Sequence, residues 1–219
     1  MSAHKDNSEA TPKARRPGRP RGSNPTATSR EQLLDIALDL FARQGIARTS
    51  LNAIAKAAGV TPAMLHYYFN SREQLLDAMI EERFLPLRSA IGAIFSAHPD
   101  DPVTALRKMV EKLAELAVQH PWFAPLWMQE VTGEMPVLRA HLQARFGGEK
   151  YQETLETIAR WQREGKLNRG LAPELLFTTL LSLVLVPFSR MRNDERLLTL
   201  SPETVVRHAL AVIGSGIGA

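Results

Sequence analysis

Cysteine is absent from this chain of 219 residues. Disulfide bonds and thiolate metal sites are therefore excluded, because both are made by the cysteine sulfur. No apolar segment follows the basic N-terminus, so the sequence shows no secretory signal. A chain without either feature is typical of a reducing compartment, and we expect a cytoplasmic protein.

Long apolar runs are also scarce. The longest extends from Leu175 to Phe188 and is interrupted by Thr178, Thr179 and Ser182. It is short for a membrane span, which needs about 20 apolar residues. The run therefore predicts a buried helix, and we expect no membrane partner.

The chain lacks the signatures of an enzyme. It contains neither a glycine-rich phosphate loop nor a serine nucleophile elbow, and its histidines do not show the i, i+4 spacing of metal ligands. His98 and Asp100 lie close to Asp101 in the sequence, but Asp101-Pro102 has the form of a helix start. We expect no enzymatic activity, no metal and no cofactor.

Acidic residues are missing from the segment between Asp39 and Glu73, which contains four basic residues. Residues 1–30 carry seven basic and two acidic residues, a balance of +5, against +4 for the whole chain. Positive charge is thus concentrated in the N-terminal part, as expected where a protein meets nucleic-acid phosphate.

What the sequence does contain is helical periodicity, in nearly every segment after residue 28. We expect an all-α fold, preceded by a disordered basic arm at residues 1–28 that has no apolar face. The stretch SREQLLD occurs at residues 29–35 and again at 71–77. Ser followed three residues later by Gln predicts a capping box at each copy. Because the residues after the two copies differ, two independent helix starts are favoured over a duplicated domain.

Caps, prolines and glycines predict the limits of the helices. We expect a bend near Pro86 in the helix that begins at Ser71, and an interruption at Gly147-Gly148 is left open. The expected helices cover residues 29–45, 51–58, 62–69, 71 to beyond 82, 102–119, 121–130, 136–164, 173–190 and 201–213.

The second and third of these helices are short and are joined by Gly59, Val60 and Thr61, which predicts a helix-turn-helix. Leu65 and Phe69 are four residues apart and face the core, so the opposite face of the third helix is exposed. That face has Ala63, Met64 and Tyr67, flanked by His66 and Tyr68. An ordinary helical corner with exposed aromatic residues is the alternative.

The segment ARTSLNAIAKAAGVTPAMLHYYFNSREQLLDAM resembles the DNA-binding region of the TetR-type transcriptional repressor family. Thr-Ser, Ile-Ala, Ala-Gly-Val and Tyr-Phe ahead of a Ser-basic-Glu segment carry the resemblance, over about residues 29–80. It implies a homodimer of all-helical subunits. Each subunit would have a three-helix head at residues 29–80 and a ligand-binding and dimerisation domain at residues 81–219.

The resemblance also implies which residues contact double-stranded operator DNA. Ala63 stands where the family frequently has Gly, and His66 where it commonly has Tyr. The implied phosphate contacts are Thr49, Ser50, Thr61 and Arg72, the base-facing residues are Ala63, Met64 and Tyr67, and His66 lies beside them.

The basic arm contains RRPGRPRGS, which resembles an AT-hook, with Pro17 where the family usually has Arg. A Gly-Arg-Pro core lets an extended arginine enter a narrow A·T minor groove. We expect an accessory DNA contact that adds affinity and salt sensitivity; a solvated tail is the alternative. The arginines concerned are Arg15, Arg16, Arg19 and Arg21.

Large apolar side chains of the C-terminal part predict a core and a pocket for a small apolar or aromatic effector. Most of them are expected to be core, with His120, Gln129 or Glu130 as polar groups that orient the effector. The candidate pocket residues are Phe95, Met109, His120, Trp122, Phe123, Trp127, Met128, Glu130 and Trp161.

The helices expected at about residues 173–190 and 201–213 are apolar around most of their circumference. We expect them to pair across a two-fold axis as a four-helix dimer interface; a single fully buried core helix is the alternative. Taken together, the sequence predicts a repressor that an effector releases from a palindromic operator. Activation in place of repression is left open, and a helical lipophile-binding protein with a structural head is the runner-up.

Overall fold

The computed structural model describes residues 29–133, 136–146, 149–191 and 194–214, and every regular element in these ranges is a helix. The predicted all-α fold is confirmed there, and the basic arm lies outside the described residues. The helices are α1 (Arg30–Gln44), α2 (Leu51–Ala57), α3 (Pro62–Tyr68), α4 (Arg72–Met79), the π-helix η1 (Ile80–Phe84), α5 (Leu85–Ala97), α6 (Pro102–Gln119), α7 (Phe123–Thr132), α8 (Val137–Phe146), α9 (Glu149–Arg163), α10 (Pro173–Arg190) and α11 (Pro202–Gly214).

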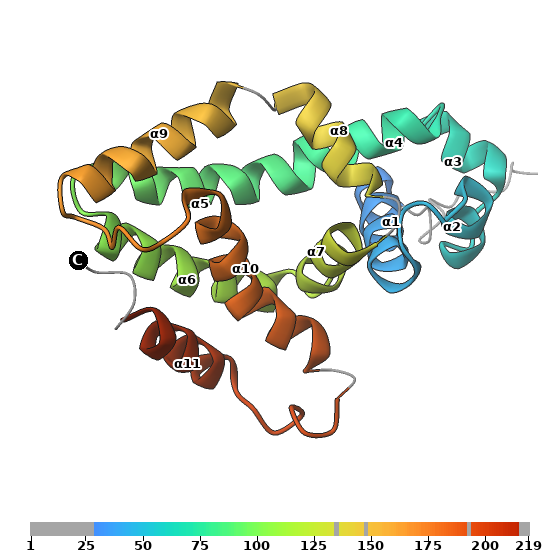
Figure 1. Ribbon diagram of the computed structural model, residues 1–219. Coiled ribbons are helices and arrows are strands. Elements are labelled where there is room, and N and C mark those ends of the chain that lie inside the picture. The colour runs from blue at the N-terminus through green and yellow to red at the C-terminus, as the bar shows by residue number, and fades with distance from the viewer. Residues whose placement is uncertain (1–28, 134–135, 147–148, 192–193, 215–219) are drawn as a thin grey trace, which may run out of the picture.

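Helices α1 to α3 form a compact head at one end of the molecule (Figure 1). Phe41 of α1, Ile54 of α2 and Leu65 of α3 are each at most 1% exposed and share one apolar core. The same core includes Leu126 of α7 and Leu138 of α8. The head therefore packs directly on the C-terminal helices, and the domain boundary at residue 80 stays a prediction.

The two copies of SREQLLD do begin helices, but their caps differ. At Ser29 the capping box is complete, because the Ser side chain accepts from Gln32 N at 3.2 Å and the Gln32 side chain accepts from Ser29 N at 2.8 Å. At Ser71 the Ser side chain accepts from Gln74 N at 3.2 Å, and the reciprocal bond from Ser71 N to the Gln74 side chain is not among the bonds described there. The prediction of a full capping box at both copies is wrong for the second.

Helix α4, the π turn η1 and helix α5 follow one another without a break and run from the head along the length of the molecule (Figure 1). The predicted bend near Pro86 takes the form of this π turn. Proline has no N–H to donate to the carbonyl four residues earlier, and a π turn is one way in which a helix absorbs such a defect. In this turn Leu85 N donates to the carbonyl of Ile80, five residues earlier, and not to a carbonyl four residues earlier as in an α-helix.

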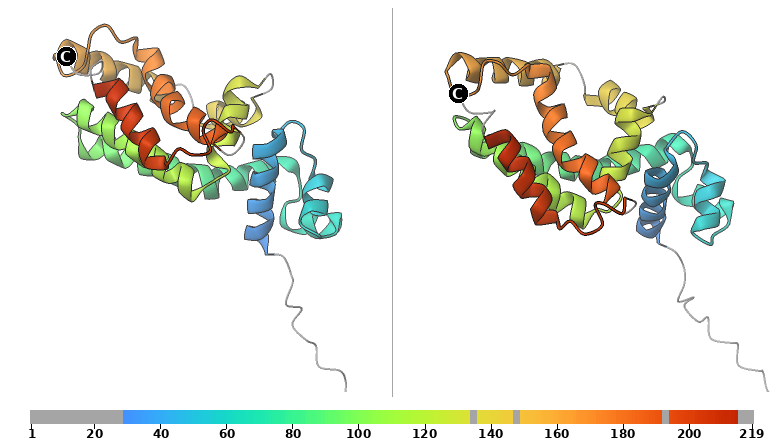
Figure 2. Two further views of the ribbon diagram at one scale, coloured as in Figure 1. Left: turned by 90° about the horizontal axis from the view of Figure 1, so that it is seen from below. Right: turned by 60° about the horizontal axis from the view of Figure 1, so that its bottom comes forward.

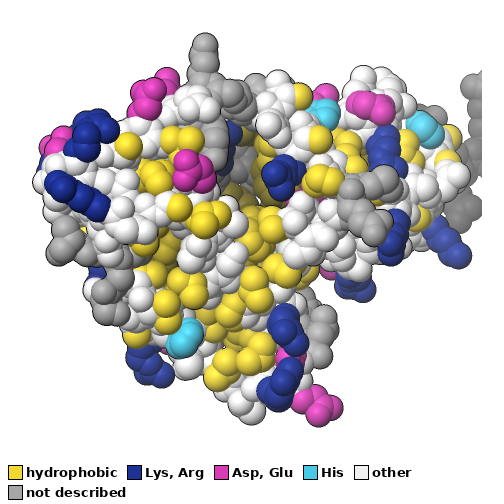
Figure 3. Space-filling view, viewed as in Figure 1, with side chains coloured by type: hydrophobic (Ala, Val, Ile, Leu, Met, Phe, Trp, Pro, Cys, Tyr) yellow, Lys and Arg dark blue, Asp and Glu magenta, His cyan; other side chains and the backbone are white. Residues whose placement is uncertain are grey.

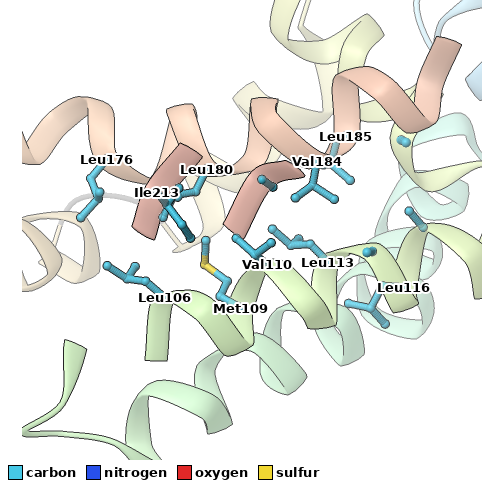
Figure 4. Close-up of a cluster of buried hydrophobic side chains, with 14 of the residues drawn as sticks. Leu106, Met109, Val110, Leu113, Leu116, Leu176, Leu180, Val184, Leu185 and Ile213 are labelled. Carbon is cyan, nitrogen blue, oxygen red and sulfur yellow. The ribbon is translucent and has the colours of Figure 1, made fainter. Parts of the chain in front are cut away.

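The C-terminal helices surround a second apolar core. Figure 4 shows α6 presenting Met109 and Val110 toward Leu180 of α10 and Ile213 of α11. Helix α6 also packs against α5, and α10 packs against α7. In the views of Figure 2 the head and α11 lie at different ends of the molecule, so this core separates the head from the C-terminal helix.

The helix expected over residues 136–164 is interrupted, as the sequence analysis left open: α8 ends at Phe146 and α9 begins at Glu149. Gly147 and Gly148, where the interruption was expected, lie outside the described ranges. Helix α7 begins at Phe123, because Trp122 occupies its N-cap position, two residues after the Pro121 start expected from the sequence.

Helix α10 is long and apolar enough to cross a membrane by length and composition, with a mean hydropathy of 1.3 over 18 residues, contrary to the sequence-based expectation. One such helix is weak evidence of a span, because the core helices of other proteins meet the same criteria. Only 22% of this window is buried within the single chain. The sequence predicts a buried helix, and a single subunit buries only part of it. Leu176, Leu180 and Val184 are the side chains of α10 that lie in the core.

Candidate nucleic-acid interface

The turn between α2 and α3 is built by local hydrogen bonds. Gly59 has a φ of 66°, in the left-handed region that glycine adopts without steric cost, and Val60 N donates to the carbonyl of Ala55 at 3.0 Å. The Ser50 side chain accepts from the N–H of the third helical residue of α2 at 3.1 Å, and the Thr61 side chain accepts from Met64 N of α3 at 3.3 Å. Both N-caps are of the residue types that favour helix starts.

Helix α3 presents one exposed face, as predicted. Leu65 is fully buried, whereas Ala63 and His66 are exposed and Tyr67 is 81% exposed. Met64 is only half-buried rather than open to solvent. The outer face of α3 is therefore open to solvent, and it lies at the outer end of the head (Figure 1).

Tyr67 is held by its neighbour. Its ring meets that of Tyr68 edge-on at 5.2 Å between centroids, and Tyr68 packs against the core of the head. Because edge-to-face pairs are the favoured arrangement of aromatic rings, the exposed tyrosine is oriented before any partner arrives.

Two predicted phosphate contacts are placed differently by the structure. Thr49 is 1% exposed, and its hydroxyl donates to the carbonyl of Gly45 at 2.8 Å. Arg72 donates to the carbonyl of Thr49 at 2.9 Å and also to that of Ile46. Both side chains therefore hold the loop between α1 and α2. This arrangement opposes a direct phosphate contact by Thr49 and leaves Arg72 engaged inside the head.

Sequence reasoning missed the contacts of Arg30. Its guanidinium donates to both carboxylate oxygens of Glu82 in η1 at 2.7 and 2.6 Å, and its Cζ lies 5.1 Å from the ring centroid of Phe69 at the end of α3. The hydrogen bond from Arg30 holds the pKa of the Glu82 carboxyl below its usual value. A second pair joins Arg83 of η1 to Asp35 of α1 at 3.0 Å. The head is thereby tied to the π turn.

The surface of the head is basic. Arg48 and Lys56 are exposed, and Arg43 pairs with Asp39 at 2.7 Å on the exposed side of α1. Figure 3 shows, on one face, basic side chains over the head and a broad hydrophobic area over the C-terminal domain. The arginines of the predicted AT-hook, Arg15, Arg16, Arg19 and Arg21, lie outside the described residues.

The candidate effector-pocket residues do not line one pocket. Phe95 and Trp161 stack at 6.5 Å between centroids and, with Phe177, line a cavity of about 730 Å³ between α5, α9 and α10. Trp122 and Met128 line a separate groove of about 660 Å³ between α1 and α7. The remaining apolar candidates, Met109, Phe123 and Trp127, pack in or against the core of the C-terminal domain.

Of the three polar candidates, Gln129 lines the groove with Trp122 and Met128, whereas Glu130 and His120 line neither space. Glu130 is 6% exposed and accepts from Arg139 N at 3.1 Å at the start of α8. Burial raises the pKa of its carboxyl, and the backbone hydrogen bonds from Arg139 and Leu138 oppose that shift. His120 lies 5.7 Å from the ring of Trp122, and burial lowers its pKa. Neither side chain lines the cavity beside Phe95 and Trp161.

The fold and this site define an all-α protein with an N-terminal helix-turn-helix domain. Residues 33–79 match the profile of the bacterial regulatory proteins of the tetR family. This domain of the chain is therefore similar to that family. The match covers α2, α3 and α4 and most of α1, and it confirms the predicted resemblance.

Curated relatives support the same assignment. The chain is 35% identical over 94 residues to the HTH-type transcriptional regulator AcrR of Shigella flexneri, an alignment that covers 41% of this chain and 42% of that regulator. It is 36% identical over 102 residues to the regulator BetI of Rhizobium meliloti, covering 44% and 45% of the two chains. The chain therefore spans less than half the length of these two relatives.

Solved structures extend the likeness to the C-terminal helices. A ketosteroid transcriptional regulator of Mycobacterium tuberculosis has a TM-score of 0.66 at 18% identity, over 89% of this chain and 99% of that one. NalD of Pseudomonas aeruginosa, the secondary repressor of the MexAB-OprM multidrug efflux pump, has a TM-score of 0.59 at 25% identity, over 86% and 96%. The fold is thus shared along most of the described chain.

Proposed function

We propose that the protein is a ligand-responsive transcriptional regulator, not an enzyme, that acts in the cytoplasm and binds palindromic operator DNA as a homodimer. The observation that carries this proposal is the exposed outer face of α3, held in a helix-turn-helix that matches the tetR family. In this proposal the protein represses transcription while it is bound to the operator, and binding of the effector releases it from the DNA. The relatives named above are regulators, which favours this reading over a lipophile-binding protein with a structural head.

In the proposed complex, α3 enters the major groove and the head contacts the flanking phosphates. Ala63, Tyr67 and the half-buried Met64 face the bases, and His66 lies beside them. Hydroxyl groups of Ser50 and Thr61, both exposed, reach phosphate oxygens at the starts of α2 and α3. Thr49 and Arg72 act indirectly by fixing the loop that positions α2.

The proposed dimer interface is formed by α10 and α11. Leu175 of α10 is 61% exposed and Val212 of α11 is 48% exposed, and both line an apolar groove of about 370 Å³ between the two helices. An exposed apolar surface of this kind is typical of a surface that a partner covers. Pairing two copies across a two-fold axis places two copies of α3 on one face of a DNA duplex.

The proposed effector site is the cavity lined by Phe95, Trp161 and Phe177. Its aromatic walls suit an apolar or aromatic molecule. One wall is α5, which continues through η1 into α4 beneath the head. A ligand that favours a different tilt of α5 would thus change the spacing of the two heads, which is an equilibrium shift between two arrangements.

A gel-shift titration on DNA from upstream of the protein's own gene tests the proposal. Wild type and Tyr67→Ala are compared at two salt concentrations, with Val131→Ala, at a 41% exposed position on α7, as the matched control. We expect tight, salt-sensitive binding by wild type and control, and loss of the specific complex in Tyr67→Ala with its helical content unchanged. Equal binding by all three proteins would contradict the proposed reader.

A further inference from the structure

The exposed face of α3 contains few hydrogen-bonding groups. Pro62, Ala63, His66 and Tyr67 are exposed on it and lie within one side of the helix at 100° per residue. None of them is Arg, Lys, Asn or Gln, the residues that read guanine or adenine with paired hydrogen bonds. Direct reading of a purine by two parallel hydrogen bonds is therefore not available to this face.

The one imidazole on this face is already partly engaged. His66 Nδ1 lies 3.2 Å from the carbonyl of Asn70, and since a carbonyl only accepts, Nδ1 carries the proton. The ring can then offer a base one hydrogen bond, through Nε2. Asn70 itself follows the C-cap of α3, away from the N-terminal residues of a recognition helix that usually contact bases.

Apart from the hydroxyl of Tyr67, the remaining groups on the face are apolar. Ala63 contributes a methyl group, Pro62 a ring, and Tyr67 an aromatic ring that meets the ring of Tyr68 edge-on. In the major groove the thymine C5-methyl is the apolar feature that distinguishes one base pair from another. The chemistry of the face and of this methyl group are complementary.

We infer that α3 recognises its operator by apolar contact with thymine methyl groups, made by Ala63 and the ring of Tyr67. This inference rests on the proposed function and specifies the DNA: each half-site contains thymine where α3 enters the major groove. The basic residues Arg48 and Lys56, both exposed, add affinity for phosphate and carry no base preference.

The test separates the thymine methyl from every other property of the base. The full chain, refolded from denaturant so that no effector is carried over, selects duplexes from a random library. Thymine in the selected half-sites is then replaced, one position at a time, by uracil, which keeps all hydrogen-bonding groups and lacks only the methyl. We expect a loss in affinity of roughly fourfold for each methyl that is buried against the protein.

Protein variants locate the contact. Ala63→Gly removes the methyl group on the protein side, and Asn70→Ala, at an exposed residue beyond the helix, is the control. If Ala63 touches the thymine methyl, the uracil penalty at that position shrinks in Ala63→Gly and is retained in Asn70→Ala, because two changes to one contact are not additive. Tyr67→Phe keeps the ring and is expected to keep the penalty.

Two results would overturn the inference. One is a selected duplex that is bound with unchanged affinity when uracil replaces thymine throughout; the other is a uracil penalty that is identical in wild type and Ala63→Gly at every thymine position. Both leave the proposed function standing, since a specific duplex was selected. A chain that enriches no duplex would instead contradict the proposed function.

Discussion

At the scale of single residues, the side chains with the clearest roles in the head are those that tie its parts together. Arg30 reaches both Phe69 at the end of α3 and Glu82 in the π turn, while Arg72 fixes the loop before α2. Their partners are 23 or more residues away in the chain. The exposed face of α3 could be predicted from helical periodicity, whereas these contacts could not, because they depend on how the helices pack.

Arg30→Gln tests the first of these contacts. Arg30 and Glu82 are 39% and 34% exposed, so we expect the substitution to lower the free energy of unfolding by only about 1 kcal/mol, from a pair partly screened by water and a cation–π contact. Urea denaturation measures the change. The control is Arg43→Gln, which removes a more exposed pair with Asp39 and is expected to change little. Equal effects of the two substitutions would argue against a special role for Arg30.

Glu130 gives a pH-dependent prediction. Because burial raises the pKa of its carboxyl above the usual 4.5, the folded state binds more protons than the unfolded state, and its contribution to stability decreases as the pH rises above 4.5. Glu130→Gln keeps an oxygen that can accept from Arg139 N. We expect its unfolding free energy at neutral pH to equal or exceed that of wild type.

Denaturation of both proteins from mildly acidic to neutral pH measures this difference. Glu130→Leu is the companion variant: it removes the acceptor at the start of α8 and is expected to be less stable than either, since the partly buried N–H of Arg139 loses its partner. A Glu130→Gln protein that is less stable than wild type at neutral pH would show that the carboxylate charge itself is needed there.

At the scale of elements, helix starts were predicted closely because caps are local. Ser29, Thr61 and Asp101 each precede their helix and accept from a backbone N–H three residues later. The π turn before Pro86 was predicted only as a bend, because its hydrogen-bond pattern depends on packing at both ends. Arg83 Nη1 lies 3.4 Å from the carbonyl of Glu82, the group that a proline at position 86 leaves unpaired.

Pro86→Ala tests whether this proline maintains the π turn. A restored N–H can pair with the carbonyl of Glu82, so we expect slower amide hydrogen exchange across residues 80–90 and a gain in stability of about 1 kcal/mol. Pro202→Ala, at the first position of α11 where no helix precedes, is the control and is expected to show no such gain. Unchanged exchange in Pro86→Ala would mean that packing, not proline, holds the π turn.

At the scale of the whole molecule, the proposed function depends on three regions: the α3 face, the cavity beside α5, and the apolar surface of α10 and α11. The sequence predicted the first and third as faces of helices. It failed to predict the cavity. Trp122 and Met128 were expected to line one pocket with Phe95 and Trp161, but they line a separate groove between α1 and α7. Tertiary packing decides which large side chains lie in the core and which line a cavity.

The dimer surface has a direct test. Leu175→Asp places a charge on the exposed part of α10, and we expect sedimentation to show a monomer, because burying an unpaired carboxylate is costly. Leu198→Asp is the matched control. Leu198 is similarly exposed, at 58%, but it belongs to the segment that connects the end of α10 to the start of α11. Dimers of both variants would place the interface elsewhere on the chain.

The most direct measurement is a nuclease footprint of the full chain on DNA upstream of its own gene. We expect two protected half-sites related by a two-fold axis. Their centres should be separated by one helical turn of DNA, about 34 Å, or by a multiple of that distance. Protection should disappear in Tyr67→Ala. A footprint that persists in Tyr67→Ala, or a single half-site without a symmetric mate, would contradict the central claim that paired α3 helices read the operator.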